Sequence, residues 1–81
     1  MSVRVEILYF AALREAAGIA SEYIETEAAD LAALYAGVQA RHALAFPQRQ
    51  LRVAVDGAFA GWAEAVRAGS TIAFIPPVSG G

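Results

Sequence analysis

One amphipathic segment constrains the fold of this chain more than any other feature of the sequence. Within residues 31–42 the apolar positions follow the i, i+3, i+4, i+7 spacing of one helix face: Leu31, Leu34, Tyr35 and Val38. Asp30 stands directly before them, where its carboxylate can accept from the free N–H groups of a first helical turn. Gly37 either lowers the stability of this helix slightly or marks a close approach to a neighbouring element. The chain of 81 residues therefore has one principal helix whose apolar face needs a cover.

Segments with a period of two predict a sheet that supplies this cover. Residues 3–10 place two sets of side chains on opposite faces, namely Val3, Val5, Ile7 and Tyr9 against Arg4, Glu6, Leu8 and Phe10. Residues 51–55 and 71–75 alternate in the same way, and residues 21–27 do so less regularly. Asp56-Gly57 is a strong hairpin signal and predicts a very short return strand at 59–61. Pro76-Pro77 ends the last strand.

The remaining segments complete a fold of the α+β class. Residues 11–17 are rich in helix formers and stop at Gly18, so a short helix follows the first strand. Residues 43–50 contain Pro47 and form a connection. The order predicts a mixed sheet of four to five strands packed on one main helix, the ubiquitin-like β-grasp arrangement, with the first and last long strands parallel. Tyr35 and Trp62 are expected to pack in or beside the core.

Composition excludes several classes of function. Six arginines, no lysine and eight acidic residues give a net charge of -2 and no basic stripe, so we expect no nucleic-acid partner. The absence of cysteine removes disulfides, thiolate metal sites and thiol nucleophiles, and we expect no bound metal or cofactor. No apolar run reaches the roughly 18 residues of a membrane span, and the alternating polar and apolar residues after Met1 are not the pattern expected of a signal peptide. A soluble cytoplasmic protein with no membrane partner is expected.

The C-terminus is the most informative stretch of the sequence. Pro76-Pro77 stiffens its base, whereas Gly80-Gly81 lacks side chains and can thread a narrow channel toward a distant active site. We therefore divide the chain into a domain at residues 1–75 and a flexible tail at residues 76–81. The working group is the α-carboxyl of Gly81, which a partner has to activate because the chain has no phosphate-binding loop of its own.

Three stretches carry a resemblance to a known family: Tyr9-Phe10-Ala11, Leu13-Arg14-Glu15 with Gly18, and Ala73-Phe74-Ile75-Pro76-Pro77-Val78-Ser79-Gly80-Gly81. Together they resemble the small, sulfur-carrier subunit of molybdopterin synthase. The resemblance covers essentially the whole chain, and its last nine residues are the most specific part. Other carriers that end in Gly-Gly, such as that of the thiamine pathway, share the terminal pair but not usually the Pro-Pro-Val-Ser lead-in.

The resemblance implies a function as a sulfur donor. Gly81 is expected to be adenylated by a ubiquitin-activating-like adenylyltransferase that uses ATP, then converted to a thiocarboxylate with sulfur supplied through a sulfurtransferase. The tail, including Gly80, then enters the large subunit of the synthase. There the sulfur passes to cyclic pyranopterin monophosphate, and two carriers in a heterotetramer supply the dithiolene sulfurs of the molybdenum cofactor. The chain itself is expected to be non-catalytic.

Pleat parity predicts the surface that binds the partner. If the helix covers one face of the sheet, then Leu8, Phe10, Ala54 and Ile75 lie on the other, with Phe59 added from the hairpin. Predicted partner-binding residues are Phe10, Arg14, Phe59, Ile75, Pro76, Pro77 and Val78. The alternative for the aromatic residues is a small satellite core beneath the 11–17 helix. Arg14 is expected to hold a partner's carboxylate or, alternatively, to pair with neighbouring glutamates in solvent.

Other functions stay open from the sequence. His42 suits the negative end of the main helix and has no second ligand or base in the sequence to make it catalytic. One alternative function is another Gly-Gly carrier or a ubiquitin-like modifier, serving thiamine synthesis, tRNA thiolation or conjugation. Another is a noncovalent β-grasp interaction module whose tail is idle.

Overall fold

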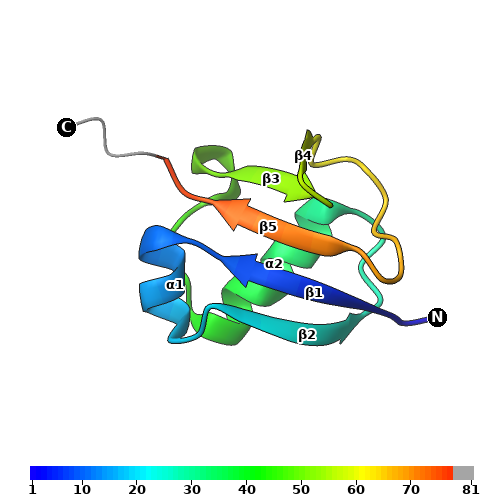
Figure 1. The fold of residues 1–81 in the computed structure, drawn as a ribbon, viewed down its shortest axis with the longest axis horizontal. Coiled ribbons are helices and arrows are strands. Elements are labelled where there is room, and N and C mark those ends of the chain that lie inside the picture. The colour runs from blue at the N-terminus through cyan, green and yellow to red at the C-terminus, as the bar shows by residue number, and fades with distance from the viewer. Residues whose placement is uncertain (78–81) are drawn as a thin grey trace.

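The computed structural model describes residues 1–77, which form one mixed sheet with helical segments at its face and edge (Figure 1). The elements in chain order are β1 (Val3–Tyr9), α1 (Ala11–Ala17), β2 (Ser21–Thr26), α2 (Leu31–His42), the 3₁₀ turn η1 (Gln48–Gln50), β3 (Arg52–Val55), β4 (Ala58–Ala60) and β5 (Thr71–Ile75). The predicted helices agree with α1 and α2, and each predicted strand is found to within about two residues.

The sheet has the strand order β2-β1-β5-β3-β4. β1 pairs antiparallel with β2 and parallel with β5, whereas β5 pairs antiparallel with β3. The parallel pairing of the first and last long strands is as predicted. Because β1 and β5 are parallel, they finish at the same end of the sheet. Tyr9 and Phe74 lie opposite each other there, and the chain continues from them into Phe10 and Ile75. We call this end of the sheet its tail end, and α1 lies beside it (Figure 1).

The core lies between the sheet and α2. The side chains that face α2 are almost fully buried: Val5, Ile7, Tyr9, Val53, Ile72 and Phe74. They pack against the predicted helix stripe and against Leu13 of α1. Tyr35 is buried in edge contact with Phe74, and the half-buried Trp62 stacks on the same ring with centroids 6.0 Å apart. The predicted packing role of Tyr35 and Trp62 is therefore confirmed.

Local signals in the sequence fix the ends of the elements. Asp30 caps α2 by accepting from the Ala33 N–H at 2.8 Å. Gly18 ends α1 with φ of 79°, and its N–H donates to the carbonyl of Arg14. Asp56 and Gly57 both have positive φ, 50° and 88°, as the turn of a two-residue hairpin requires.

Two expectations need correction. β1 ends at Tyr9 and not at Phe10, because Phe10 is the N-cap residue of α1 and its carbonyl accepts from the N–H groups of Leu13 and Arg14. Gly37 does not mark a close approach to the sheet, since it is exposed and an added Cβ would meet no atom within 4 Å.

The predicted domain and tail meet just after β5. Pro76 is buried against the domain and Pro77 is exposed. The division at residue 75 remains a prediction, because most of the predicted tail lies outside the described residues. Within residues 1–77, neither helix is long and apolar enough for a membrane crossing.

Candidate partner interface at the tail end

The face of the sheet that α2 leaves uncovered carries a continuous set of apolar side chains. In the strand register, Ala54 lies opposite both Phe59 and Ala73, and Ala73 lies opposite Leu8. Small side chains at the centre and larger ones at the margin make a hollow of about 260 Å³. We call it the outer hollow, lined by Leu8, Phe10, Ala54, Gly57, Phe59, Thr71, Ala73 and Ile75.

Two aromatic side chains project from the walls of the outer hollow. Phe10 is 45% exposed and Phe59 is 66% exposed, although both are large apolar residues. The guanidinium of Arg52 lies over the Phe59 ring, 5.0 Å from its centroid, and covers part of it. The predicted apolar patch is therefore confirmed. The alternative of a satellite core is wrong for these residues. The buried residue of α1 is Leu13, which packs in the main core, and α1 does not cover Phe10.

A second apolar depression adjoins the hollow where the chain leaves β5. This tail groove has a volume of about 660 Å³ and is lined by Phe10, Ala11, Ala12, Phe46, Ile75, Pro76 and Pro77. Ala11 has φ of 49°, an unusual value for a residue with a Cβ, at the point where the chain turns from β1 into α1. Phe10 and Ile75 line both depressions, so they form a ridge between the groove and the hollow.

The structure brings together most of the predicted partner-binding residues. Phe10, Ile75, Pro76 and Pro77 meet in the groove, and Phe59 joins them across the hollow. Arg14 is exposed on α1, and within residues 1–77 it makes no ion pair, so its predicted pairing with neighbouring glutamates is not seen. Val78, Gly80 and Gly81 lie outside the described residues. Ala12 and Phe46 were missed, since Phe46 belongs to a segment that looked only like a connection.

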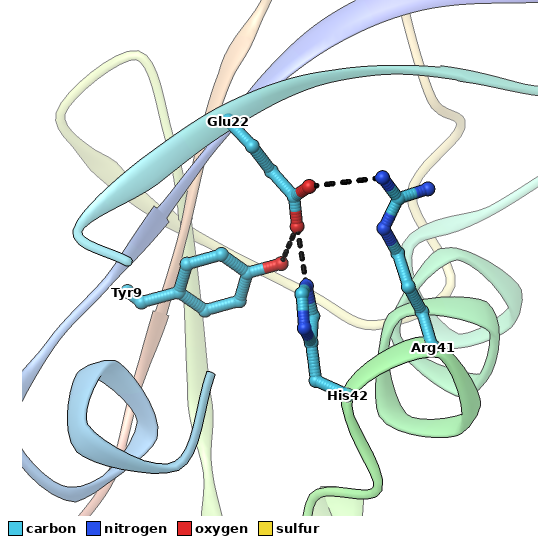
Figure 2. Close-up of polar contacts among 4 residues, drawn as sticks. All are labelled: Tyr9, Glu22, Arg41 and His42. Atoms are coloured by element: carbon cyan, nitrogen blue, oxygen red, sulfur yellow. Dashed lines mark hydrogen bonds and ion pairs between the residues drawn. The ribbon is translucent and has the colours of Figure 1, made fainter. Parts of the chain in front are cut away.

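A polar cluster of Tyr9, Glu22, Arg41 and His42 was also missed (Figure 2), and its member Tyr9 directly precedes Phe10 in the chain. The Tyr9 hydroxyl donates to Oε2 of Glu22 at 2.5 Å, and Nε2 of His42 lies 2.5 Å from the same oxygen. Because an ionised carboxylate has no proton to give, His42 is the donor in the second contact. Arg41 pairs with Oε1 of Glu22 at 3.3 Å. The cluster joins β1, β2 and the end of α2.

The surroundings shift the pKa values of two groups in this cluster. Burial by itself raises the pKa of Glu22, but the hydrogen bonds from Tyr9 and His42 and the charge of Arg41 outweigh it, and the net shift is downward. Burial, and then the bond to the Glu22 carboxylate, raise the pKa of the Tyr9 hydroxyl far above its ordinary value. Glu22 thus stays ionised and Tyr9 stays a hydrogen-bond donor, so the cluster contains no free base. We call this cluster the brace, because its contacts connect β1, β2 and the end of α2.

The expected role of His42 at the helix end was therefore incomplete, because its partner is a side chain on another element. The alternation of side chains along β2 is the signal that could have identified Glu22. Glu22 lies opposite Ile7 and is on the inward face of the sheet with Ile24, whereas Tyr23 is exposed on the other face. No group of three or more metal-binding His, Cys, Asp or Glu side chains occurs in the part of the chain that the structure describes.

The chain matches the ThiS family model over residues 7–81. No curated protein matches it significantly. Small archaeal modifier protein 1 (SAMP1) from Haloferax volcanii superposes with a TM-score of 0.81 at 27% identity, over 96% of this chain and 99% of that one. A putative molybdopterin converting factor subunit 1 from Pyrococcus furiosus gives 0.77 at 29% identity, over 94% and 99%.

A solved complex contains a further relative. In the complex of subunits 1 and 2 of the molybdopterin-converting factor from Helicobacter pylori, the matching chain has a TM-score of 0.65 at 25% identity, over 98% of this chain and 100% of that one. Fold, sequence model and neighbours agree with the resemblance in the sequence. The chain belongs to the ThiS family and has the ubiquitin-like β-grasp fold of its sulfur carriers.

Proposed function

We propose that this chain is the sulfur-carrier small subunit of molybdopterin synthase. The observation that carries the proposal is the meeting of the outer hollow and the tail groove at Phe10 and Ile75, directly before the segment that ends in Gly80-Gly81. A partner that covers these depressions binds the domain at the base of the tail. The solved relatives include a putative molybdopterin converting factor subunit 1 and a chain from a complex of subunits 1 and 2 of molybdopterin-converting factor.

The chemistry proposed for the terminus needs two further partners. In a ubiquitin-activating-like adenylyltransferase, a carboxylate oxygen of Gly81 attacks the α-phosphorus of ATP and pyrophosphate leaves. The terminal sulfur of a persulfide on a sulfurtransferase then attacks the acyl carbon and displaces AMP, which gives an acyl disulfide. A thiol reduces this disulfide, and the terminus is released as a thiocarboxylate. ATP belongs to the activating enzyme, so the carrier itself needs no cofactor site. A cytoplasmic location follows from this need for ATP.

In the synthase, the large subunit supplies the catalytic site and this chain supplies the sulfur. The depressions hold the large subunit while the tail reaches its active site, where cyclic pyranopterin monophosphate accepts sulfur. Two carriers in a heterotetramer provide the two sulfurs of the dithiolene. Tyr9 and His42 both hydrogen-bond Glu22 in the brace, so this cluster offers no free general base, and the chain is proposed to be non-catalytic.

A second candidate is a protein modifier, which is favoured by the similarity to SAMP1. Activation of Gly81 is the same in both cases, but an amine of a target protein attacks the acyl group and an amide forms. Carriers for thiamine synthesis or tRNA thiolation differ only in the sulfur acceptor. A noncovalent module with an idle tail requires no activation at all.

The acceptor of the sulfur tests the proposal. Chain carrying the Gly81 thiocarboxylate, mixed with the large subunit and cyclic pyranopterin monophosphate, should return to the carboxylate form as the dithiolene product appears, with two carriers consumed for each product. Chain ending in an ordinary carboxylate is the control and should give no product. Failure to form product, while the same preparation thiolates another acceptor or forms amides with proteins, would contradict the assignment.

A further inference from the structure

The charged side chains are divided unevenly between the two ends of the sheet. At the tail end β1 and β5 finish, β2 and β3 begin, and α1, η1 and the last turn of α2 lie beside them (Figure 1). These elements carry four arginines and two glutamates: Arg14, Arg41, Arg49, Arg52, Glu15 and Glu22. The side chains of this end therefore have an excess of two positive charges.

The opposite end has the reverse balance. It carries six acidic side chains, Glu6, Glu25, Glu27, Asp30, Asp56 and Glu64, against two arginines, Arg4 and Arg67. Its excess is four negative charges, which with the two positive charges of the tail end gives the overall value of -2. The side-chain charges are therefore separated along the sheet although the net charge is small. The positive end of this dipole is the tail end, where the depressions lie.

Three of the tail-end arginines are near neighbours, in sequence or in strand register, of residues that line the depressions. Arg41 is occupied by Glu22, but the other three are exposed and make no ion pair within residues 1–77. Arg52 lies opposite Ile75, and its guanidinium lies over the Phe59 ring. Arg14 donates its backbone N–H to the Phe10 carbonyl, and Arg49, in η1, comes three residues after Phe46. We call Arg14, Arg49 and Arg52 the arginine collar.

We infer that the arginine collar binds carboxylates of the partner protein. The surface that covers the outer hollow and the tail groove would be apolar at its centre and rimmed with Asp and Glu side chains. The planar guanidinium can hold a carboxylate through two parallel hydrogen bonds. The same acidic rim of the partner repels the acidic end of the sheet. The charge distribution therefore orients the carrier so that its tail end faces the partner as the two proteins meet. The inference rests on the proposed function in its choice of the large subunit as partner.

Association kinetics with the purified large subunit test this inference. Arg14→Glu and Arg49→Glu reverse charge in the collar, and Arg67→Glu makes the same charge change at the opposite end. All three side chains are exposed, and an unchanged melting temperature checks the fold of each variant. At about 50 mM salt, each collar variant should associate about 3- to 10-fold more slowly than wild type, and Arg67→Glu within about twofold of it. The difference should shrink at about 500 mM salt.

The outcomes separate the inference from the function on which it rests. Wild-type binding with equal effects of Arg49→Glu and Arg67→Glu, or with no effect of either collar variant, overturns the carboxylate rim and leaves the carrier proposal standing. Faster association of the collar variants shows a basic partner surface and also overturns it. No binding of the wild-type chain to the large subunit overturns the proposed function and the inference together.

Discussion

The hydroxyl of Tyr9 and the imidazole of His42 share one carboxylate oxygen of Glu22, and their rings meet edge to face with centroids 5.4 Å apart. Tyr9 is the last residue of β1, and Phe10, the exposed wall of both depressions, follows it directly. The brace therefore fixes the end of the strand from which the partner-binding ridge begins. We therefore expect the ionisation of Glu22 to affect stability and, through Phe10, the proposed partner interface.

Removing the carboxylate should destabilise the fold. Glu22→Ala leaves the buried Tyr9 hydroxyl and His42 without their acceptor, so the free energy of unfolding should fall by about 2 kcal/mol. Urea denaturation measures this loss. Glu25→Ala, at an exposed position of the same strand, is the matched control and should change the value by less than about 0.5 kcal/mol. Equal losses in the two variants would show that the brace adds nothing specific.

The brace should also make stability depend on acid pH. The folded-state pKa of Glu22 lies below its ordinary value of 4.5, so unfolding takes up a proton there. Its stabilisation is complete above that ordinary value and is lost as the pH falls through the lower folded-state pKa. Unfolding free energies of wild type and Glu22→Gln should therefore differ most near neutral pH and converge in acid. A gap that stays constant into acid would contradict this role.

The two exposed phenylalanines should matter for binding more than for folding. Phe10→Ala and Phe59→Ala should each weaken affinity for the large subunit about tenfold or more, because they remove anchors beside apolar depressions. Their melting temperatures should stay close to wild type. Phe74→Ala, in the core, is the contrasting variant and should lose about 3–5 kcal/mol of stability. Large losses of stability in both surface variants would show that these rings are core.

Most of the fold could be predicted because its signals are local. The alternation in β1 and β5, the Asp30 cap and the Asp56-Gly57 turn each need only a few consecutive residues. The same alternation of side chains predicted that Phe10, Phe59 and Ile75 lie on the surface, because one helix can cover only one face of the sheet.

The brace and the tail groove could not be predicted in the same way. Tyr9, Glu22 and His42 come from three elements, and their meeting depends on the register of β2, which the weak alternation of residues 21–27 left uncertain. Phe46 lies in a connection without periodicity. The Tyr35 hydroxyl and the Gln39 side-chain amide donate hydrogen bonds to its carbonyl and hold it in place. No pattern in the sequence predicts these contacts.

Replacing the terminal residue should slow activation without abolishing it. Gly81→Ala retains the α-carboxyl but adds a Cβ and restricts the backbone, which a narrow channel in the activating enzyme tolerates poorly. We expect slower formation of the adenylate and unchanged affinity for the large subunit. Pyrophosphate release under single-turnover conditions measures the rate. A rate equal to wild type would show that the channel does not select for glycine.

The central claim, that sulfur is carried on the α-carboxyl of Gly81, is tested most directly by intact-mass analysis. Wild-type chain and a chain with one residue added after Gly81 are incubated with the activating enzyme, ATP and a sulfur donor. Wild type should gain the mass difference between sulfur and oxygen, located in the C-terminal peptide, and the extended chain should gain nothing although its described fold and depressions are unchanged. An increment on both chains, or on neither with an enzyme shown to be active, would contradict the account.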